Sequence, residues 1–491
     1  MINKIKNKIR SKITVIATGI LLLIFISSCA LYTSQKAPSL QVPTAFKNAN
    51  KFTSANLKDH WWLNFNDAKL NQLVDLALQN NVNYQVALKN IIIARTYVTQ
   101  NRAALFPQAN LNAGVSRNAI SHNASINQNF NTPLYNLYQL NGSVSYQADV
   151  WSSIRNSVKQ AVANVKVSEA GANVIKLSII SSIVSSYWQI VALNSNLDNL
   201  KQQYNAATEI ERLNQDQYKG GLVDIEPIDN AKTQIETIKS AISSLEKQRQ
   251  ILQNTLAYLV GIYPENFNFN IGNTLQSSET SFTHLLPTGI PAKMLINRPD
   301  IQSSFYQVIS YGYAQKQSLA AFFPTFMLTG VYGFASTGLG NFTSGGSTLW
   351  SFGASAIQTL LDFGKIYSQY KRARLQYEAA VLTYKNTVIN AFTEVNNALV
   401  SYQQDYLALK ASRNIVELAK DKLGLADAQY KSGVINYITY LGYKLTFLQS
   451  KYTLTTQAQT LTSDVIQIYQ TLGMGLSLDP APKKLQLAGT V

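Results

Sequence analysis

The cysteine and histidine side chains, which most often supply nucleophiles, general bases and metal ligands, are few and scattered along the chain. Its 491 residues include one cysteine, Cys29, and three histidines, His60, His122 and His284. A single cysteine excludes a disulfide framework and a cysteine-cluster metal site. None of the histidines has an acid or a cysteine at a spacing that local structure would bring together. We therefore expect no enzyme, no metal site and no cofactor.

The single cysteine ends a segment typical of a secretion signal. Residues 1–12 are basic and residues 13–26 are apolar. The apolar stretch would rise about 21 Å as a helix, short of the ~30 Å bilayer core, so a cleaved signal peptide fits better than a membrane anchor. Ile26-Ser27-Ser28-Cys29 resembles a bacterial lipobox, which implies that residues 1–28 are removed and Cys29 is lipidated. Ordinary cleavage beside a chance cysteine is the alternative.

The charge composition argues against nucleic acid as a partner. The chain has 42 Lys and Arg against 26 Asp and Glu, a net charge of +16, yet only 14% of its residues are charged. Ordinary soluble proteins have roughly 25%. Five of the basic residues lie within residues 1–12 and would leave with the signal. A nucleic-acid-binding protein would concentrate its charge in a compact basic domain.

Proline spacing permits two very long helices. No proline occurs from residue 134 to 226 or from 325 to 479, and both stretches are rich in Ala, Gln, Leu and Lys, which favour helix. We expect helices over residues 154–218 and 365–430, each about 65 residues or 100 Å long. Such lengths exceed a globular domain and indicate a coiled coil or a helical barrel.

Short motifs recur in the same order at an offset of 212 to 217 residues, which indicates a tandem duplication. Each copy predicts a helix, two strands, a long helix, a turn and a shorter helix. The recurring pairs are Leu105-Phe106-Pro107 with Phe322-Phe323-Pro324, Asp149-Val150-Trp151 with Asp362-Phe363-Gly364, Gln217-Tyr218-Lys219 with Gln429-Tyr430-Lys431, and Leu259-Val260-Gly261 with Thr471-Leu472-Gly473.

Apolar and polar residues alternate one by one in four stretches, which predicts strands. They lie at about 108–117 and 137–151 in the first copy and at about 324–336 and 347–358 in the second. Apolar and aromatic side chains occupy one parity and small polar ones the other, as in a membrane barrel with lipid outside and water inside. A half-buried strand of a soluble sheet is the alternative. Four strands cannot enclose a lumen, and open edges are not viable in lipid, so the chain must oligomerise.

Further motifs match a known family pattern over roughly residues 57–478. They are Trp62-Leu63-Asn64-Phe65-Asn66-Asp67, Asn297-Arg298-Pro299-Asp300-Ile301, Ala320-Ala321-Phe322-Phe323-Pro324 and Leu361-Asp362-Phe363-Gly364-Lys365. With them the chain resembles the outer membrane factor family, the TolC/OprM-like efflux channels, in its lipoprotein branch. The resemblance implies a mixed α and β membrane protein. Three protomers, with four strands each, would form a twelve-stranded outer-membrane β-barrel continued by a long α-helical periplasmic barrel.

These expectations divide the chain into six consecutive parts. They are a lipoprotein signal peptide at 1–28, an extended lipidated tether at 29–58, a first repeat at 59–270, an equatorial linker at 271–290, a second repeat at 291–478 and a C-terminal tail at 479–491.

The helical hairpins would reverse at two tips, residues 217–230 and 429–442. The resemblance implies that these tips form the periplasmic entrance and contact an adaptor protein. Glycine at such a place can also serve the turn alone. The positions that match the family's adaptor contacts are Tyr218, Gly221, Leu222, Tyr430, Gly433 and Val434.

The second tip departs from the family pattern, in which carboxylates close the entrance. Ile435 stands where Asp often follows Gly-Val, while Asn436 and Tyr437 match. We therefore expect a constriction dominated by Ile435, Tyr437 and Tyr440. The tip acids lie on the first tip and would form at most a supporting acidic ring; solvated, outward-facing acids are the alternative. These acids are Asp224, Glu226 and Asp229.

The expected function is a passive exit duct in the bacterial outer membrane for drugs or other small toxic molecules. The resemblance implies a homotrimer that a periplasmic adaptor and an inner-membrane pump open at the tip. The channel of a type I protein secretion system is the alternative, and a non-channel envelope scaffold lipoprotein is a weaker one. The alternating strands argue against the scaffold.

Overall fold

The computed structural model describes residues 60–119, 134–272 and 298–473, together with Pro43, Phe46 and Leu295. Several segments predicted from the sequence lie outside these residues. They are the signal peptide, Cys29, nearly all of the tether, most of the linker and the C-terminal tail.

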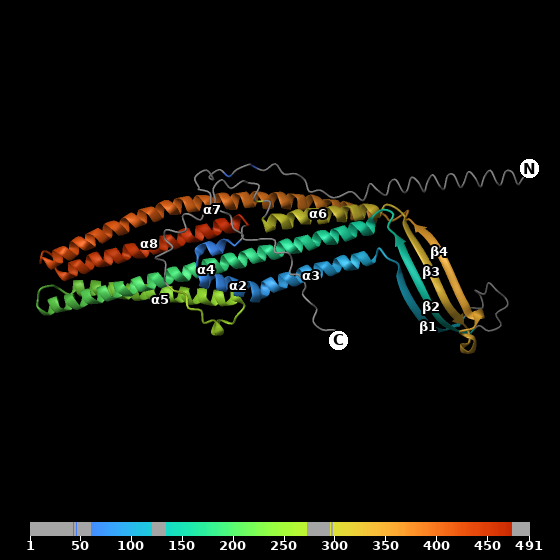
Figure 1. Ribbon diagram of the computed structural model, residues 1–491, viewed down its shortest axis with the longest axis horizontal. Helices are drawn as coiled ribbons and strands as arrows, with labels where there is room; N and C mark the ends of the chain where they lie inside the picture. The colour runs from blue at the N-terminus through green and yellow to red at the C-terminus, as the bar shows by residue number, and fades with distance from the viewer. Residues whose placement is uncertain are drawn as a thin grey trace, which may run out of the picture. The chain divides into compact units, whose positions relative to one another are not determined.

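Two successive sets of elements have the same order (Figure 1). The matching helices have 22, 67 and 35 residues in both sets. This equality confirms the duplication. The first set is α3 (Val82–Ala103), β1 (Gln108–Ala119), β2 (Leu134–Ala148), α4 (Ser153–Lys219) and α5 (Glu226–Val260), and the second is α6 (Pro299–Ala320), β3 (Thr325–Ser336), β4 (Thr348–Ile357), α7 (Lys365–Lys431) and α8 (Tyr437–Thr471).

Short elements flank these sets. The helices η3 (Trp61–Phe65) and α2 (Ala68–Asn80) precede the first set, and η5 (Pro264–Asn266) follows α5. The connection between β3 and β4 contains the two single-turn helices η8 (Leu339–Asn341) and η9 (Gly345–Ser347).

The strands form one antiparallel sheet in the order β1-β2-β3-β4. Its register lines up Leu111, Gly142, Tyr332 and Trp350 in one row across the four strands. The adjacent row contains Asn112, Asn141, Gly333 and Leu349 and therefore points to the opposite face. Pairing thus gathers the apolar parity of every strand on one face and the polar parity on the other, as the alternation predicts.

An aspartate lies at each transition from a strand to a 67-residue helix, after β2 and after β4. Asp149 accepts hydrogen bonds from the backbone N–H groups of Ile154 and Arg155, both at 2.9 Å. Asp362 likewise accepts from Gly364 and Ile366 at the start of α7. Such carboxylates satisfy free amides at a helix N-terminus. Because Asp149 is used in this way, β2 ends at Ala148, three residues before the end that its alternation suggests.

The described residues form two compact units. One lies within Asn90–Ser168 and Ser303–Tyr384 and contains the sheet; the other contains the remaining described residues and is helical. Each unit draws on both repeats, so the units do not coincide with the duplicated segments. The helices α4 and α7 each contribute residues to both units.

The core of the helical unit includes the short N-terminal helices. The Trp61 ring stacks on that of Tyr469 in α8, with centroids 5.0 Å apart, and Phe65 packs on Trp188 in α4 at 5.6 Å. Leu70 of α2 is fully buried. Part of α4 is apolar and long enough to cross a membrane by composition, but most of that stretch is buried in the protein.

Candidate functional site

Both helical hairpins reverse through the same turn. Gly221 and Gly433 have φ of +70° and +76°, the left-handed region. The amides of the next residues, Leu222 and Val434, donate to carbonyls in the preceding helical turn at 2.9 and 2.8 Å. This is a glycine-based helix ending in which any side chain on the glycine would strain the backbone.

Apolar side chains at both tips face solvent. Leu222 and Val434 are 77% and 70% exposed, and Tyr218 and Tyr430 are 47% and 40% exposed. These are four of the six adaptor-contact candidates, and the other two are the turn glycines. The tips therefore present apolar groups in a form that a protein partner can cover. Their role as adaptor contacts remains a prediction.

Three tyrosines cluster at the second tip. The ring centroids of Tyr430, Tyr437 and Tyr440 lie 5.1 to 5.8 Å from one another. The cluster joins one adaptor-contact candidate on α7 to two constriction candidates on α8. Such ring contacts add about 0.5–1.5 kcal/mol each beyond burial. The α7–α8 turn is therefore held by aromatic packing.

The other constriction candidates of this tip have different surroundings. Asn436 is the N-cap of α8, where its Oδ1 accepts from the Thr439 amide at 2.8 Å. This capping role was not foreseen from the sequence. Ile435 is partly buried.

The three acids of the first tip are exposed. Glu226 and Asp229 lie in the first turn of α5. Negative charge at this place stabilises a helix because it complements the helix dipole. Asp229 also lies 3.9 Å from the ammonium of Lys232. Stabilising the start of α5 is thus a role that two of these acids have in the single chain. An acidic ring that includes Asp224 remains a prediction.

The two faces of the sheet have opposite chemistry. On one face Leu111, Trp350 and Phe352 are each at least 75% exposed. On the other, the Asn112 amide donates to the Asn141 side chain at 3.1 Å and to the Ser143 hydroxyl at 3.2 Å. An exposed apolar face opposite a hydrogen-bonded polar face suits a wall between lipid and water.

The ends of α5 and α8 repeat a packing arrangement that was not recognised from the sequence. Gly261 and Gly473 have φ of +78° and +68°. A Cβ on Gly261 would lie 2.5 Å from the Asn80 carbonyl oxygen, and one on Gly473 would lie 2.9 Å from the Arg298 side chain. Each glycine therefore permits the segment that leads into α3 or α6 to pack against the end of α5 or α8.

Buried polar side chains complete both junctions. Asn81, just before α3, donates to the Leu259 carbonyl at 2.8 Å, and Arg298, just before α6, donates to the Thr471 carbonyl at 2.5 Å. Asn81 and Arg298 precede matching helices and bond to matching carbonyls. The equivalence escaped sequence comparison because an amide and a guanidinium look unrelated.

Arg298 also binds two carboxylates. It forms ion pairs of 2.7 Å with Asp300 and with Glu394 of α7. Burial opposes its charge, but these hydrogen bonds hold the pKa of Arg298 above its ordinary value. The Arg-Pro-Asp motif therefore joins the start of α6 to α7 and to the end of α8.

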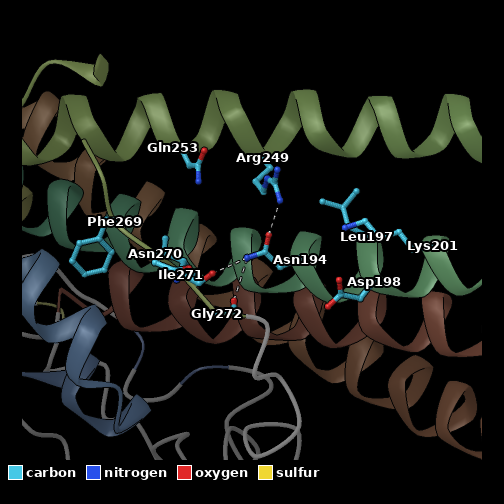
Figure 2. Close-up of a pocket in the computed structure, with 10 residues that line it drawn as sticks. All are labelled: Asn194, Leu197, Asp198, Lys201, Arg249, Gln253, Phe269, Asn270, Ile271 and Gly272. Atoms are coloured by element: carbon cyan, nitrogen blue, oxygen red, sulfur yellow. Dashed lines mark hydrogen bonds between the residues drawn. The ribbon is translucent and has the colours of Figure 1, made fainter. Parts of the chain in front are cut away.

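A cavity of about 310 Å³ lies between α4, α5 and the segment that follows η5 (Figure 2). Asn194 donates to the carbonyls of Ile271 and Gly272 at 2.9 and 3.3 Å and accepts from Arg249 at 3.5 Å. These bonds hold the segment to the hairpin. The lining contains no nucleophile beside a base. No group of three metal-ligating side chains occurs within the part of the chain that the structure describes.

The chain is similar to a known protein family over both repeats. The family model described as outer membrane efflux protein matches residues 73–262 and again 290–474. The two matches correspond to the two sets of elements.

Individual relatives extend this similarity over most of the chain. The antibiotic efflux pump outer membrane protein ArpC of Pseudomonas putida is 23% identical over 92% of this chain and 93% of its own. The probable outer membrane lipoprotein SilC of Salmonella typhimurium is 22% identical over 91% and 95%. The crystal structure of the CmeC outer membrane channel of Campylobacter jejuni superposes with a TM-score of 0.80, at 25% identity over 90% of this chain and 95% of that one. The chain therefore belongs to the outer membrane efflux protein family, as a channel component and not an enzyme.

Proposed function

We propose that three copies of the chain form an outer-membrane duct, anchored through lipid on Cys29, that expels drugs or other small toxic molecules. The observation that carries the proposal is the four-stranded sheet, with its exposed apolar face, its polar opposite face and its two open edges. The name of the similar antibiotic efflux protein supports this substrate class, and that of the similar lipoprotein supports the anchor.

The open edges of β1 and β4 determine how copies would assemble. Unpaired strand edges are not viable in lipid, so β4 of one copy would pair with β1 of the next. Two copies would supply eight strands, and side chains alone fill the interior of a barrel of about eight strands. Three copies are the smallest ring of this unit that leaves a lumen. The face of Asn112, Asn141 and Ser143 would line it with neutral polar groups.

Chain connectivity extends this seam to the helices. Helix α3 leads into β1 and α7 leaves β4, so a β4–β1 pairing between copies would bring α7 of one copy beside α3 of the next. Both segments expose apolar side chains in the sheet-containing unit. Ile93 and Tyr97 of α3 are at least half exposed, as are Leu375 and Leu382 of α7.

Exposed apolar side chains form a stripe along the rest of α7. Exposed apolar residues recur on this helix at spacings of 7 and 11, which keep side chains on one face of a packed helix. The corresponding helix of the first repeat, α4, has fewer exposed large apolar side chains. Helix α7 would therefore lie at an edge of the protomer. The stripe contains Leu375, Leu382, Ile389, Val400, Leu407, Leu418 and Leu425.

The hairpin tips would meet a periplasmic adaptor that is coupled to an inner-membrane pump, and this docking would open the duct. The exposed Leu222 and Val434 support such a contact. The constriction would be formed by Ile435, Tyr437 and Tyr440. The packing of both tyrosines on Tyr430 supports a rigid closed form.

The constriction can be tested by single-channel recording. Ile435→Ala and Tyr440→Ala should raise the closed-state conductance because each removes a bulky side chain from the narrowest point. Tyr443→Ala is the matched control, since Tyr443 lies on the same helix and is exposed outside the tyrosine cluster. An unchanged closed-state conductance in both tip variants would reject this constriction.

The transported class can be tested in a strain that lacks the gene. Loss of a drug-efflux duct should raise the accumulation of a fluorescent dye and drug susceptibility, and the wild-type chain should restore both. The secreted proteins of the same strain are compared in parallel. A strain that exports dye normally but loses a secreted polypeptide would instead support protein secretion.

A further inference from the structure

Two aspartates meet across the second helical hairpin. The carboxyl group of Asp464 in α8 lies beside that of Asp405 in α7, within hydrogen-bonding reach. The Gln457 amide donates to Asp405 Oδ1 at 3.2 Å. Asp464 Oδ2 is buried and accepts from no N–H or O–H group of the described residues. Two carboxyl groups thus lie in contact, and among the described residues an amide donates to Asp405 Oδ1 but no group donates to Asp464 Oδ2.

The surroundings supply no cation to this pair. Asp405 raises the pKa of Asp464, and Tyr402, also on α7, is a titratable group whose own pKa Asp464 raises. Tyr402 is buried, and burial, followed by Tyr406 and Asp464, raises its pKa to about 12, so it stays neutral. No Lys or Arg of the described residues forms an ion pair with either aspartate.

A proton shared by the two aspartates would remove the repulsion between their carboxylates. Two carboxylates in contact cannot both be ionised without strong repulsion, whereas an acid and a carboxylate form a short, charge-assisted hydrogen bond. Burial, followed by the neighbouring Asp405, raises the pKa of Asp464 to about 7. The proton belongs to the pair rather than to one residue.

We propose that Asp405 and Asp464 share one proton at neutral pH and thereby latch α7 to α8, and that the latch opens as the pH rises. This proton latch goes beyond the proposed export function and does not depend on it. It acts on the second hairpin alone: the residues at the matching positions of α4 and α5 are Leu193 and Leu252, neither of which is an acid.

The direction of the pH effect follows from the raised pKa. The folded hairpin holds the proton more tightly than the unfolded chain, in which an aspartate titrates near 3.8. The stabilisation is therefore complete below that value and is lost as the pH rises through about 7. Alkaline conditions leave two like charges facing each other between α7 and α8.

Infrared spectroscopy of the full-length protein in detergent detects the proton directly, because a protonated carboxyl has a C=O band that a carboxylate lacks. We expect a band that disappears with a midpoint near pH 7 and is missing in Asp464→Asn. In Asp405→Asn the midpoint should fall, since the neighbouring charge is gone. Asp421→Asn, which removes an exposed acid of α7, should leave the band unchanged. The absence of a wild-type band near neutral pH would overturn the proposal.

Hydrogen–deuterium exchange tests the latch itself. Protection factors of amides around Asp405 and Asp464 should fall by up to about tenfold per pH unit above the midpoint, as the protonated fraction falls. Asp464→Asn should keep high, pH-independent protection, because its amide donates permanently to Asp405. Wild-type protection that is independent of pH, or an Asp464→Asn variant with the same pH dependence as the wild type, would show that the pair does not latch the helices.

Discussion

At the residue scale, Arg298 and Asn81 solve the same problem with different chemistry. Each is buried before a 22-residue helix and each binds the carbonyl two residues before a left-handed glycine. The second repeat adds two carboxylates to this junction, Asp300 and Glu394. A junction with a neutral amide in one repeat has therefore become an ionic one in the other.

Arg298→Met should destabilise the helical unit by about 2–3 kcal/mol. This is below the usual range for breaking a buried ion pair, because about a third of each partner carboxylate is exposed. The measurement is the urea midpoint of the helical circular dichroism signal. Arg374→Met, which breaks an exposed pair with Glu378, should cost less than about 1 kcal/mol. Equal losses in the two variants would contradict the structural role of Arg298.

At the element scale, the close approach of β2 and β3 depends on Gly333. A Cβ at this position would lie 2.2 Å from the Leu140 carbonyl oxygen and 2.5 Å from the Asn141 Cα, which are both backbone atoms. Neither atom can move without separating the strands. Gly330, three residues earlier on the same strand, has nothing within 4 Å of its Cβ position.

Gly333→Ala should therefore impair barrel assembly, whereas Gly330→Ala should not. We expect a cost on the order of 1–3 kcal/mol from overpacking at Gly333. The fraction of chain that migrates as folded oligomer in unheated gel electrophoresis reports the effect. Comparable folded fractions for the two variants would show that the strands adjust without loss.

The same scale shows why the long elements were predictable. Helix α4 spans Ser153–Lys219, where 154–218 was expected, and α7 spans Lys365–Lys431, where 365–430 was expected. Missing prolines permit such helices, and the glycines of the two tips end them, so local signals suffice. The end of β2 was misplaced because Asp149 continues the alternation while its side chain caps α4.

Side-chain clusters between helices were not predictable in this way. Tyr430 lies on α7, whereas Tyr437 and Tyr440 lie on α8, so their contact depends on how two helices are rotated against each other. The Asp405–Asp464 pair depends on the same rotation across 59 residues of chain. Sequence periodicity describes one helix at a time and therefore identified the tips but not these contacts.

At the scale of the whole molecule, the proposed seam makes assembly sensitive to the stripe on α7. Leu382→Glu should shift the chain from trimer to monomer, because a carboxylate on a buried seam loses its hydration without gaining a partner. Lys385→Glu, at an exposed position one turn away, should assemble normally. Light scattering of the detergent-solubilised protein measures the mass. A trimeric Leu382→Glu variant would place the seam elsewhere.

The equal hairpin lengths of the two repeats have a consequence for symmetry. Helices of 67 and 35 residues in both repeats would bring six tips to the rim of a trimer, in two alternating kinds. One kind carries exposed acids, and the other carries packed tyrosines. The rim would thus be sixfold in its backbone and threefold in its chemistry. A partner with three arms can recognise one kind of tip, whereas six identical arms must tolerate both.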